Sequence, residues 1–277
     1  MIGNIEKFVK DVLHEDLGRG DLFERLIGDD FLVTAKIIAK ENGVFSGGVY
    51  IQEICRIYDI ACKWNVTDTQ EFFSGQTLIE LHGHYKILLK LERTILNILQ
   101  HSSGIASNTF GYMKMLDGVS ITILDTRKTR PLLREFEKYS VRNGGAKNHR
   151  MGLDDTLMLK DTHLKYIKNQ DLKSFIDNAR KYIPWTAKIE IESESIEFAK
   201  IAMQSGVDIV MCDNMRPEDI KEVVNFRNAN YPYVLLEGSG RITKDTIIEY
   251  AKSGVDAISI GSLIHQAVWV DMSMKMA

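Results

Sequence analysis

The sequence predicts an α/β protein, with a mixed α/β domain in about its first hundred residues and a β/α barrel after it. Short apolar runs recur through the second half of the 277-residue chain, and helical patterns with polar faces separate most of them. Nearly continuous apolar strands that alternate with helices are typical of a parallel sheet buried on both faces. A segment of this half, SGVDIVMCDN at 205–214, is also echoed as SGVDAISIGS at 253–262.

The elements of the first half follow from the spacing of its apolar residues. Residues 4–16 repeat apolar side chains at helical spacing, and residues 31–39 are β-branched and alternate like a strand. Weaker patterns predict a helix over 47–59 and strands over 62–66 and 77–82. Residues 85–100 again repeat apolar side chains on one helical face.

The second half contains six predicted strands. They are the apolar runs at 121–125, 156–160, 187–192, 208–213, 233–238 and 257–261, with helical patterns at 194–205, 217–228 and 243–253. In each copy of the echoed segment, Ser-Gly supplies a left-handed helix cap and Val-Asp opens the next strand. A repeated helix–cap–strand unit favours a β/α barrel, and an open doubly wound sheet is the alternative.

Composition excludes several classes of protein. The formal net charge of −3 gives no reason to expect nucleic acid or a membrane surface as a partner. No apolar run approaches the roughly 20 residues that span a bilayer, and the first residues do not resemble a signal peptide. The three cysteines form no CxxC pair, so neither a disulfide scaffold nor a zinc site is expected, and the cytoplasm is the expected compartment.

Each of the six apolar runs ends in a polar residue or a glycine. The terminators are Asp125, Lys160, Glu192, Asp213, Glu237 to Ser239, and Gly261. Because active sites of β/α barrels lie at the carboxyl ends of the strands, we expect these residues to converge on one polar rim.

The loop that follows the first of these strands is strongly basic. Residues 125–150 contain eight Lys or Arg residues and three acidic ones, in a chain that is acidic overall. One interpretation is a solvated helix face with ion pairs, and the other is a site where guanidinium groups bind carboxylates or phosphates. Arg127 and Lys128 follow the strand directly, which favours a site, whereas Arg134 and Lys138 could lie on the surface.

Two glycine-containing strand ends indicate phosphate binding. Gly238 and Gly240 in EGSGRIT, and Gly261 in SIGSLIH, allow backbone N–H groups to approach a ligand at the start of the following helix. Glu190 and Glu192 lie two apart on one strand and share a face, either outward to solvent or inward to the barrel. The inward alternative makes Glu192 and Asp213 neighbouring carboxylates that could bind magnesium or a sugar.

Together these segments resemble the quinolinate phosphoribosyltransferase family, whose other name is carboxylating nicotinate-nucleotide pyrophosphorylase. The resemblance spans nearly the whole chain and is most specific over residues 125–153. The segments that carry it are EDLGRGD (15–21), ERTILNILQHSSGIA (92–106), DTRKTRPLLREFEKYSVRNGGAKNHRMGL (125–153), LMLKDTH (157–163), KIEIE (188–192), MCDN (211–214), EGSG (237–240) and SIGSLIH (259–265).

The resemblance implies an open-faced α/β sandwich over residues 1–103, to which the tail 267–277 could add, and an incomplete seven-stranded β/α barrel over 104–266. It also implies a homodimer with shared active sites. The expected reaction transfers phosphoribose from phosphoribosyl pyrophosphate to quinolinate and releases carbon dioxide, in the biosynthesis of NAD. Magnesium is the expected cofactor.

The resemblance also implies roles for individual residues. Arg127, His149, Arg150 and Lys160 would bind the pyridine carboxylates, Lys128 would lie between the two substrates, and Arg93 would come from the neighbouring subunit. Glu192 and Asp213 would bind ribose and magnesium, with Lys128 and Lys160 as the other catalytic residues. The 5-phosphate would be bound by Ser239, Gly240, Gly261 and His265. The chain departs from the family pattern at Arg241, Thr162 and Ser107.

Two rival functions follow from the same residues. A relative of the same fold could act on another substrate, as the homologue found beside molybdate transporters does, but the intact TRKT and NHR stretches favour quinolinate. A barrel that only binds phosphorylated ligands is the second rival. The combination of Lys128, Lys160, Glu192 and Asp213 argues against it, because binding alone does not need all four.

Overall fold

The computed structural model describes residues 2–26, 28–167 and 171–276. The chain forms two compact units. Unit 1 comprises Met1–Phe110, Tyr139–Gly145 and Ala267–Ala277, and unit 2 comprises Gly111–Lys138 and Ala146–Gln266. In the described part of the chain, no helix combines the length and apolar character needed to cross a membrane.

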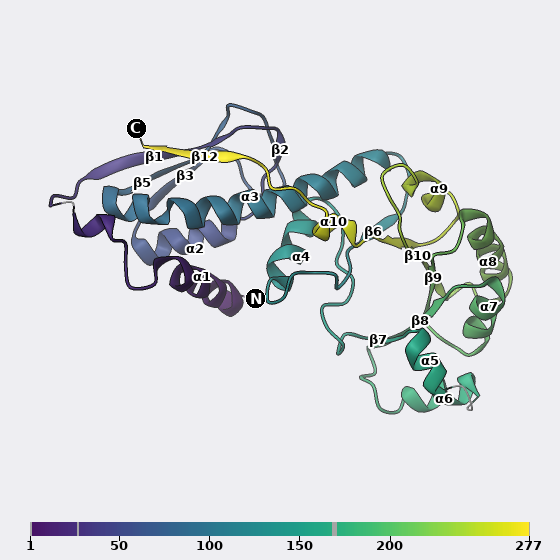
Figure 1. The fold of residues 1–277 in the computed structure, drawn as a ribbon. Helices are drawn as coiled ribbons and strands as arrows, with labels where there is room; N and C mark the ends of the chain where they lie inside the picture. The colour runs from purple at the N-terminus through teal and green to yellow at the C-terminus, as the bar shows by residue number, and fades with distance from the viewer. Residues whose placement is uncertain (1, 27, 168–170, 277) are drawn as a thin grey trace. The chain divides into compact units, whose positions relative to one another are not determined.

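Unit 1 is built on a four-stranded antiparallel sheet in the order β12-β1-β5-β3. Its helices α1, α2 and α3 lie on one side of the sheet (Figure 1). The strands are β1 (Leu32–Ala39), β3 (Ala61–Trp64), β5 (Thr77–His84) and β12 (Met272–Met276), and the helices are α1 (Ile2–Leu17), α2 (Gly48–Tyr58) and α3 (Tyr85–Met115). Two short strands, β2 (Gly43–Val44) and β4 (Glu71–Phe72), and a 3₁₀ turn, η1 (Phe23–Arg25), complete the unit.

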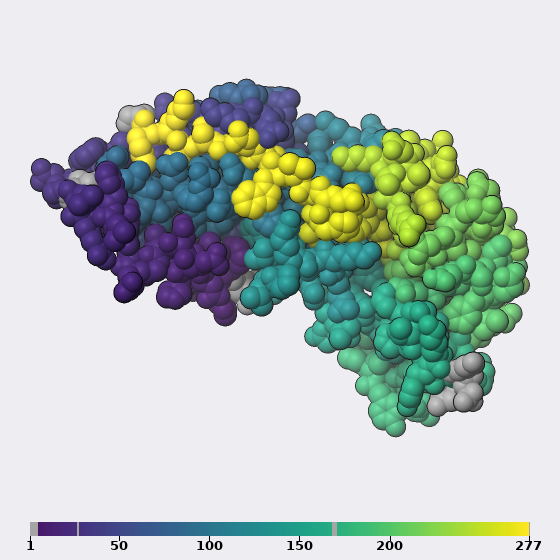
Figure 2. Space-filling model, viewed as in Figure 1, coloured from purple at the N-terminus to yellow at the C-terminus, as the bar shows by residue number. Residues whose placement is uncertain are grey.

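The alternation predicted for the first strand is confirmed. Ala35, Ile37 and Ala39 are completely buried, while the residues between them are partly exposed. The C-terminal residues form an edge strand, because β12 pairs with β1 from Ala35↔Met276 to Ala39↔Met272. Figure 2 shows these residues in yellow against the blue and purple surface of unit 1. A sheet with helices on one face matches the open-faced sandwich that the sequence predicts.

Unit 2 contains a six-stranded parallel sheet in the order β6-β11-β10-β9-β8-β7. All six predicted strands are present, and α7 and α8 lie on the outer side of β8, β9 and β10 (Figure 1). The strands are β6 (Thr122–Leu124), β7 (Thr156–Leu159), β8 (Lys188–Ser193), β9 (Ile209–Asp213), β10 (Leu235–Ser239) and β11 (Ala257–Ser259). The helices that follow them are α4 (Arg134–Asn143), α5 (Asp161–Ile167), α6 (Leu172–Ala179), α7 (Ile196–Gln204), α8 (Pro217–Asn230), α9 (Ile247–Ala251) and α10 (Ser262–His265).

The strand order identifies an incomplete barrel and rules out the doubly wound alternative. From β7 to β11 each strand pairs with its successor, and the last strand pairs with the first, β6. The seventh strand that the resemblance implies is reduced to one parallel bridge between Lys147 and Leu124. Among the pairings of the described residues none joins this segment to β7, so the ring of strands stays open there.

The echoed SGVD segments have the same structure in both copies. Gly206 and Gly254 have φ angles of 84° and 97°, which confirms the predicted left-handed caps. Each aspartate then caps the neighbouring strand: Asp208 accepts a hydrogen bond from the Ile189 N–H, and Asp256 accepts one from the Leu236 N–H, both at 2.7 Å. The repeated segment therefore fixes the start of two strand pairs, β8 with β9 and β10 with β11.

Each capping aspartate also binds an arginine, but in different surroundings. Arg180 contacts Asp208 at 3.1 Å, and both side chains are more than 30% exposed. Arg227 contacts Asp256 at 2.8 Å, and its side chain is only 9% exposed. Arg227 also donates to the carbonyl oxygen of Val234 at 3.0 Å. The second pair is thus a buried ion pair with one solvent-accessible partner.

We predict that Asp256→Ala lowers the free energy of unfolding more than Asp208→Ala does. Loss of Asp256 leaves a buried guanidinium without its counter-charge, which costs about 3 kcal/mol. Loss of Asp208 leaves Arg180 to be solvated by water and removes one capping hydrogen bond, which costs about 1 kcal/mol. Urea unfolding of the two variants measures the difference, and equal losses would contradict the role assigned to burial.

Candidate functional site

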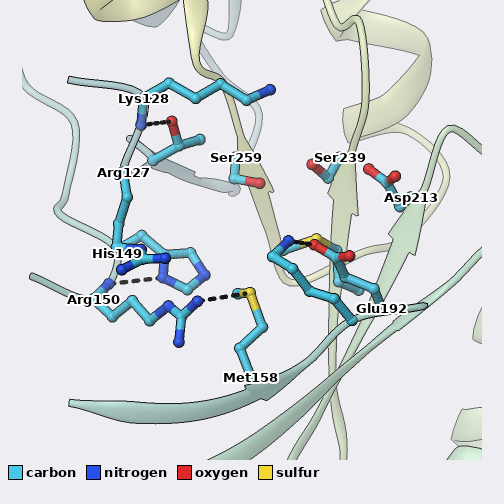
Figure 3. Close-up of a pocket in the computed structure, with 12 residues that line it drawn as sticks. Arg127, Lys128, His149, Arg150, Met158, Glu192, Asp213, Ser239 and Ser259 are labelled. Atoms are coloured by element: carbon cyan, nitrogen blue, oxygen red, sulfur yellow. Dashed lines mark hydrogen bonds and ion pairs between the residues drawn. The ribbon is translucent and has the colours of Figure 1, made fainter. Parts of the chain in front are cut away.

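Unit 2 has a cavity of about 390 Å³ at the carboxyl ends of its parallel strands. Figure 3 shows side chains from several strands and loops pointing into it. Its lining residues are Thr126, Arg127, Lys128, His149, Arg150, Met158, Lys160, Glu192, Met211, Asp213, Ser239 and Ser259. Of the predicted strand terminators, Lys160, Glu192, Asp213 and Ser239 line this cavity, at the end of the barrel where such sites are built. Asp125, Glu237, Gly238 and Gly261 are not among its lining residues.

Most of the predicted site residues meet in this cavity. Those that line it are Arg127, Lys128, His149, Arg150, Lys160, Glu192, Asp213 and Ser239. Gly240, Gly261 and His265 follow two of the same strands but are not among the lining residues. Arg93 is exposed on α3, in the part of that helix that belongs to unit 1.

The cations and carboxylates of the cavity are paired across its wall. The Lys160 ammonium donates a hydrogen bond to Glu192 Oε1, and the two side chains come from the ends of β7 and β8. Asp213, on β9, accepts a hydrogen bond from the Asn214 side chain at 2.7 Å. Within the described part of the chain, Arg127 and Lys128 form no ion pair with a carboxylate, so the cavity presents cations to a ligand.

A buried ion pair lies behind this cavity. Asp125 and Lys138 are both completely buried, and Lys138 Nζ lies 2.5 Å from Asp125 Oδ1. Burial raises the pKa of Asp125 and lowers that of Lys138, although the attraction between the two charges acts against both changes. The suggestion that Lys138 lies on the surface is therefore wrong. Its side chain is buried beside Asp125, which directly follows β6.

This ion pair holds the backbone of His149. The His149 N–H donates to Asp125 Oδ1 at 2.8 Å, and Lys138 Nζ donates to the His149 carbonyl oxygen at 2.7 Å. The Asn148 amide reaches the other carboxylate oxygen of Asp125 at 2.6 Å. The NHR segment, which has almost no regular secondary structure, is thus fixed by one buried pair of charges.

The His149 ring meets two buried carboxylates. Its Nε2 lies 3.3 Å from Glu237 Oε2 and 3.4 Å from Glu190 Oε2. Burial disfavours a charge on the ring, whereas the two carboxylates favour a proton on Nε2 and act to raise the pKa of His149. The Arg150 N–H donates to Nδ1 at 2.7 Å, which requires the neutral ring with its one proton on Nε2. Burial also raises the pKa of Glu190. Glu190 thus points inward, as the barrel interpretation predicted, and it lies beneath the cavity, outside its lining.

Arg150 projects its guanidinium into the cavity. It donates to the carbonyl oxygen of Thr156 at 3.0 Å and to Met158 Sδ at 3.4 Å. Burial and the nearby Arg127 lower the pKa of Arg150. Two guanidinium groups close enough to affect each other form a site for a dianion, because an anionic ligand relieves their repulsion.

Two glycines at the strand ends lie close to neighbouring residues of the protein. A Cβ atom at Gly240 would lie 2.6 Å from the Asn214 nitrogen, and one at Gly261 would lie 2.9 Å from Lys128 Cδ. Gly240 also has a φ angle of 97°. Only glycine fits both positions without displacing a neighbour.

The helix expected directly after EGSG does not begin there. α9 starts at Ile247 and has only five residues, because a turn closed by a hydrogen bond from the Thr243 N–H to Thr246 Oγ1 precedes it. α10, after Gly261, has only four residues. Such short helices add little dipole, so an anion at these strand ends depends on backbone N–H groups and side chains.

The structure also adds residues that sequence reasoning missed. Ser259 lines the cavity from β11, is 4% exposed, and its hydroxyl has no hydrogen-bond partner among the described residues. The sequence could have indicated Ser259, because it lies two residues before Gly261 and residues two apart on a strand share a face. Met158 and Met211 also line the cavity.

Comparisons with known proteins agree with this arrangement. The profile of the quinolinate phosphoribosyl transferase N-terminal domain matches residues 21–103, and that of its C-terminal domain matches residues 105–275. The chain is 36% identical to the probable nicotinate-nucleotide pyrophosphorylase [carboxylating] of Methanocaldococcus jannaschii, over 97% of this chain and 95% of the relative. It is 36% identical to the nicotinate-nucleotide pyrophosphorylase [carboxylating] of Dictyostelium discoideum, over 98% and 95%.

Solved structures show the same likeness in three dimensions. The crystal structure of NadC from Streptococcus pyogenes superposes with a TM-score of 0.92 and 36% identity, covering 100% of this chain and 98% of that chain. The nicotinate-nucleotide pyrophosphorylase from Francisella tularensis superposes with a TM-score of 0.90 and 32% identity, over 99% and 96%. Both domains, the fold and the sequence thus agree, and the chain belongs to the quinolinate phosphoribosyl transferase family.

Proposed function

We propose that this protein transfers phosphoribose from phosphoribosyl pyrophosphate to quinolinate and releases pyrophosphate and carbon dioxide, forming nicotinate mononucleotide. The observation that carries the proposal is the set of four cations, Arg127, Lys128, Arg150 and Lys160, around one cavity at the strand ends. Both substrates are polyanions, and neutralising them needs this number of cations in an otherwise acidic protein. Family membership supports the same reaction.

One side of the cavity suits the pyridine dicarboxylate. Arg127 and Arg150 supply planar guanidinium groups that bind carboxylates with two hydrogen bonds each. Met158 lies beside Arg150 and offers a polarisable apolar surface for an aromatic ring. Lys160 would be released from Glu192 to contact a carboxylate, and His149 completes this side of the wall.

The other side suits the phosphoribosyl group. Asp213 pairs with Ser239 in the register of β9 and β10, and Ser259 stands at the next position of β11 after the Gly238↔Ile258 pair. These three side chains form one level of the barrel wall. The ribose and its 5-phosphate would contact this level and the loops that carry Gly240, Gly261 and His265. Lys128, whose stem passes over Gly261, would lie between the two substrates.

Glu192 and Asp213 fit a magnesium ion that arrives with the pyrophosphate. Magnesium prefers oxygen ligands and is usually bound by one or two carboxylates together with substrate phosphates. Both carboxylates line the cavity, and both stand at strand ends that face it. When bound, the ion would neutralise charge on the pyrophosphate leaving group.

The reaction needs no covalent intermediate with the protein. The pyridine nitrogen attacks C1 of the ribose, a nitrogen–carbon bond forms, and the bond from C1 to the pyrophosphate oxygen breaks. Positive charge develops on the sugar, where Glu192 and Asp213 would stabilise it. The N-ribosylated ring is cationic, so it accepts the electron pair left when the C2 carboxylate departs as carbon dioxide. A proton then adds to C2.

The shared active site remains part of the proposal. Arg93 would enter the site of a partner subunit in a homodimer, because its side chain is exposed and it does not line the cavity of its own chain. The protein would work in the cytoplasm, where both substrates of this reaction occur as metabolites.

The proposal predicts that the protein, incubated with quinolinate, phosphoribosyl pyrophosphate and magnesium, forms nicotinate mononucleotide, pyrophosphate and carbon dioxide in equal amounts. Product separation and release of labelled carbon dioxide measure the three products. If quinolinate binds but no product forms, the catalytic assignments are wrong. If quinolinate does not bind, the relative with another substrate becomes the better proposal.

Ser259→Ala should raise KM for phosphoribosyl pyrophosphate about tenfold, since a hydrogen bond to a charged group is worth roughly 1.5–3 kcal/mol. KM for quinolinate should stay unchanged, because Ser259 lies at the level of Asp213 and Ser239. Ser253→Ala is the matched control: this serine is also 4% exposed, but its hydroxyl already donates to the Tyr250 carbonyl oxygen. Equal changes in the two KM values would place Ser259 elsewhere.

Arg93→Ala and Lys160→Ala should each reduce activity by about 100-fold, since a lost positioning group costs that much. Mixing the two inactive variants should restore about a quarter of wild-type activity, because half of the randomly formed dimers contain one intact site. Arg56→Ala, an exposed arginine of unit 1 that pairs with Glu53, is the control and should retain activity. No recovery after demonstrated subunit exchange would remove the shared site.

A further inference from the structure

Every polar atom of His149 has a partner within the protein. Its N–H and carbonyl oxygen bind Asp125 and Lys138, as described above. Ring atom Nδ1 accepts a hydrogen bond from the Arg150 N–H at 2.7 Å, and Nε2 faces Glu190 and Glu237. A buried residue whose polar atoms all have partners makes the segments around it rigid.

The hydrogen bond at Nδ1 determines where the ring proton lies. Because Nδ1 accepts from the Arg150 N–H, it carries no proton, and Nε2 carries one. A metal ion bound at Nε2 would require the opposite tautomer, with Nδ1 protonated and donating to an oxygen. His149, Glu190 and Glu237 lie close enough to hold a metal ion. The tautomer instead makes the two carboxylates acceptors for the Nε2 proton.

The two carboxylates are placed for this one donor. Glu190 comes from β8 and Glu237 from β10, on either side of β9, and their residues are 0% and 2% exposed. Both oxygens of Glu190 and Oε1 of Glu237 have no hydrogen-bond partner by strict geometry in the described part of the chain. Buried carboxylates carry a large desolvation cost, so their convergence on a single N–H indicates a role beyond packing.

The ring connects these carboxylates to the cavity. Nδ1 binds the Arg150 amide, and the Arg150 guanidinium is directed by Thr156 and Met158 into the site. A rotation of the imidazole would leave the Arg150 N–H without its acceptor, and Lys138 alone would then hold this peptide, through the His149 carbonyl oxygen. The orientation of the ring thus helps to fix the backbone of Arg150.

We propose that Glu190 and Glu237 are positioning residues, which accept the Nε2 proton of His149 and thereby hold Arg150 at the quinolinate side of the cavity. The proposal rests on the proposed function for its substrate, but its structural part concerns the protein alone. Neither carboxylate lines the cavity, so neither is assigned a contact with substrate.

The test compares two double variants. Glu190→Leu with Glu237→Leu removes both acceptors, and KM for quinolinate should rise at least about tenfold while KM for phosphoribosyl pyrophosphate changes less than about twofold. Glu190→Gln with Glu237→Gln keeps an amide oxygen at each position and should retain both KM values. An unchanged quinolinate KM in the leucine variant, or glutamines that behave like leucines, would overturn the proposal.

Coupling to Arg150 separates positioning from general damage. Arg150→Ala should raise the quinolinate KM by itself, and adding the two leucines to it should have little further effect, because the leucines act through Arg150. Full additivity would overturn the proposal. Arg227→Leu is the matched control: it removes a buried charge at the opposite ends of the strands and should lower stability but leave both KM values unchanged.

A spectroscopic measurement keeps the inference testable if the leucine variant does not fold or if quinolinate proves not to be the substrate. In the ¹⁵N spectrum of the wild-type protein, assigned by loss of the signals in His149→Asn, Nδ1 should appear unprotonated and Nε2 protonated. Observation of a protonated Nδ1 would sink the proposal whatever the enzyme assay shows. If the expected tautomer is observed but no product forms, the positioning role is supported and the proposed function fails.

Discussion

The site depends on one buried ion pair, Asp125 with Lys138. Asp125 ends the first barrel strand and Lys138 belongs to α4, and neither side chain reaches solvent. Two charges out of water are costly unless further hydrogen bonds satisfy them, and here the NHR segment supplies those bonds. The ion pair and the NHR segment therefore stabilise each other. Loop, strand and helix are thereby locked together.

The cavity and its base differ in charge. The lining holds four cations, Arg127, Lys128, Arg150 and Lys160, with the carboxylates Glu192 and Asp213, while two further carboxylates, Glu190 and Glu237, lie beneath it around His149. Cations that face an opening attract polyanionic ligands, and buried carboxylates beneath them hold the protein's own donors in one orientation. Recognition and positioning are therefore assigned to different layers of the same barrel.

Particular residues show how far the sequence could predict this structure. The apolar runs became the six strands, the SGVD glycines became left-handed caps, and Glu190 and Glu192 pointed inward as the barrel interpretation required. Four residues of the predicted rim, Lys160, Glu192, Asp213 and Ser239, line one cavity. The burial of Lys138, the reduction of the seventh strand to a bridge at Lys147 and the delayed start of α9 were not predicted. Each of these depends on a contact that local spacing does not describe.

The sequence by itself determined the main strands and helices, the parallel sheet, and the concentration of cations after the first barrel strand, because periodicity and composition are local properties. Its resemblance to a family also indicated which residues would meet. Only the tertiary structure decided that the Ser259 hydroxyl in the cavity has no partner among the described residues and that His149 meets two buried carboxylates. The physical reason is that burial and hydrogen-bond partners are set by segments far apart in the chain, which the closing of the barrel brings together.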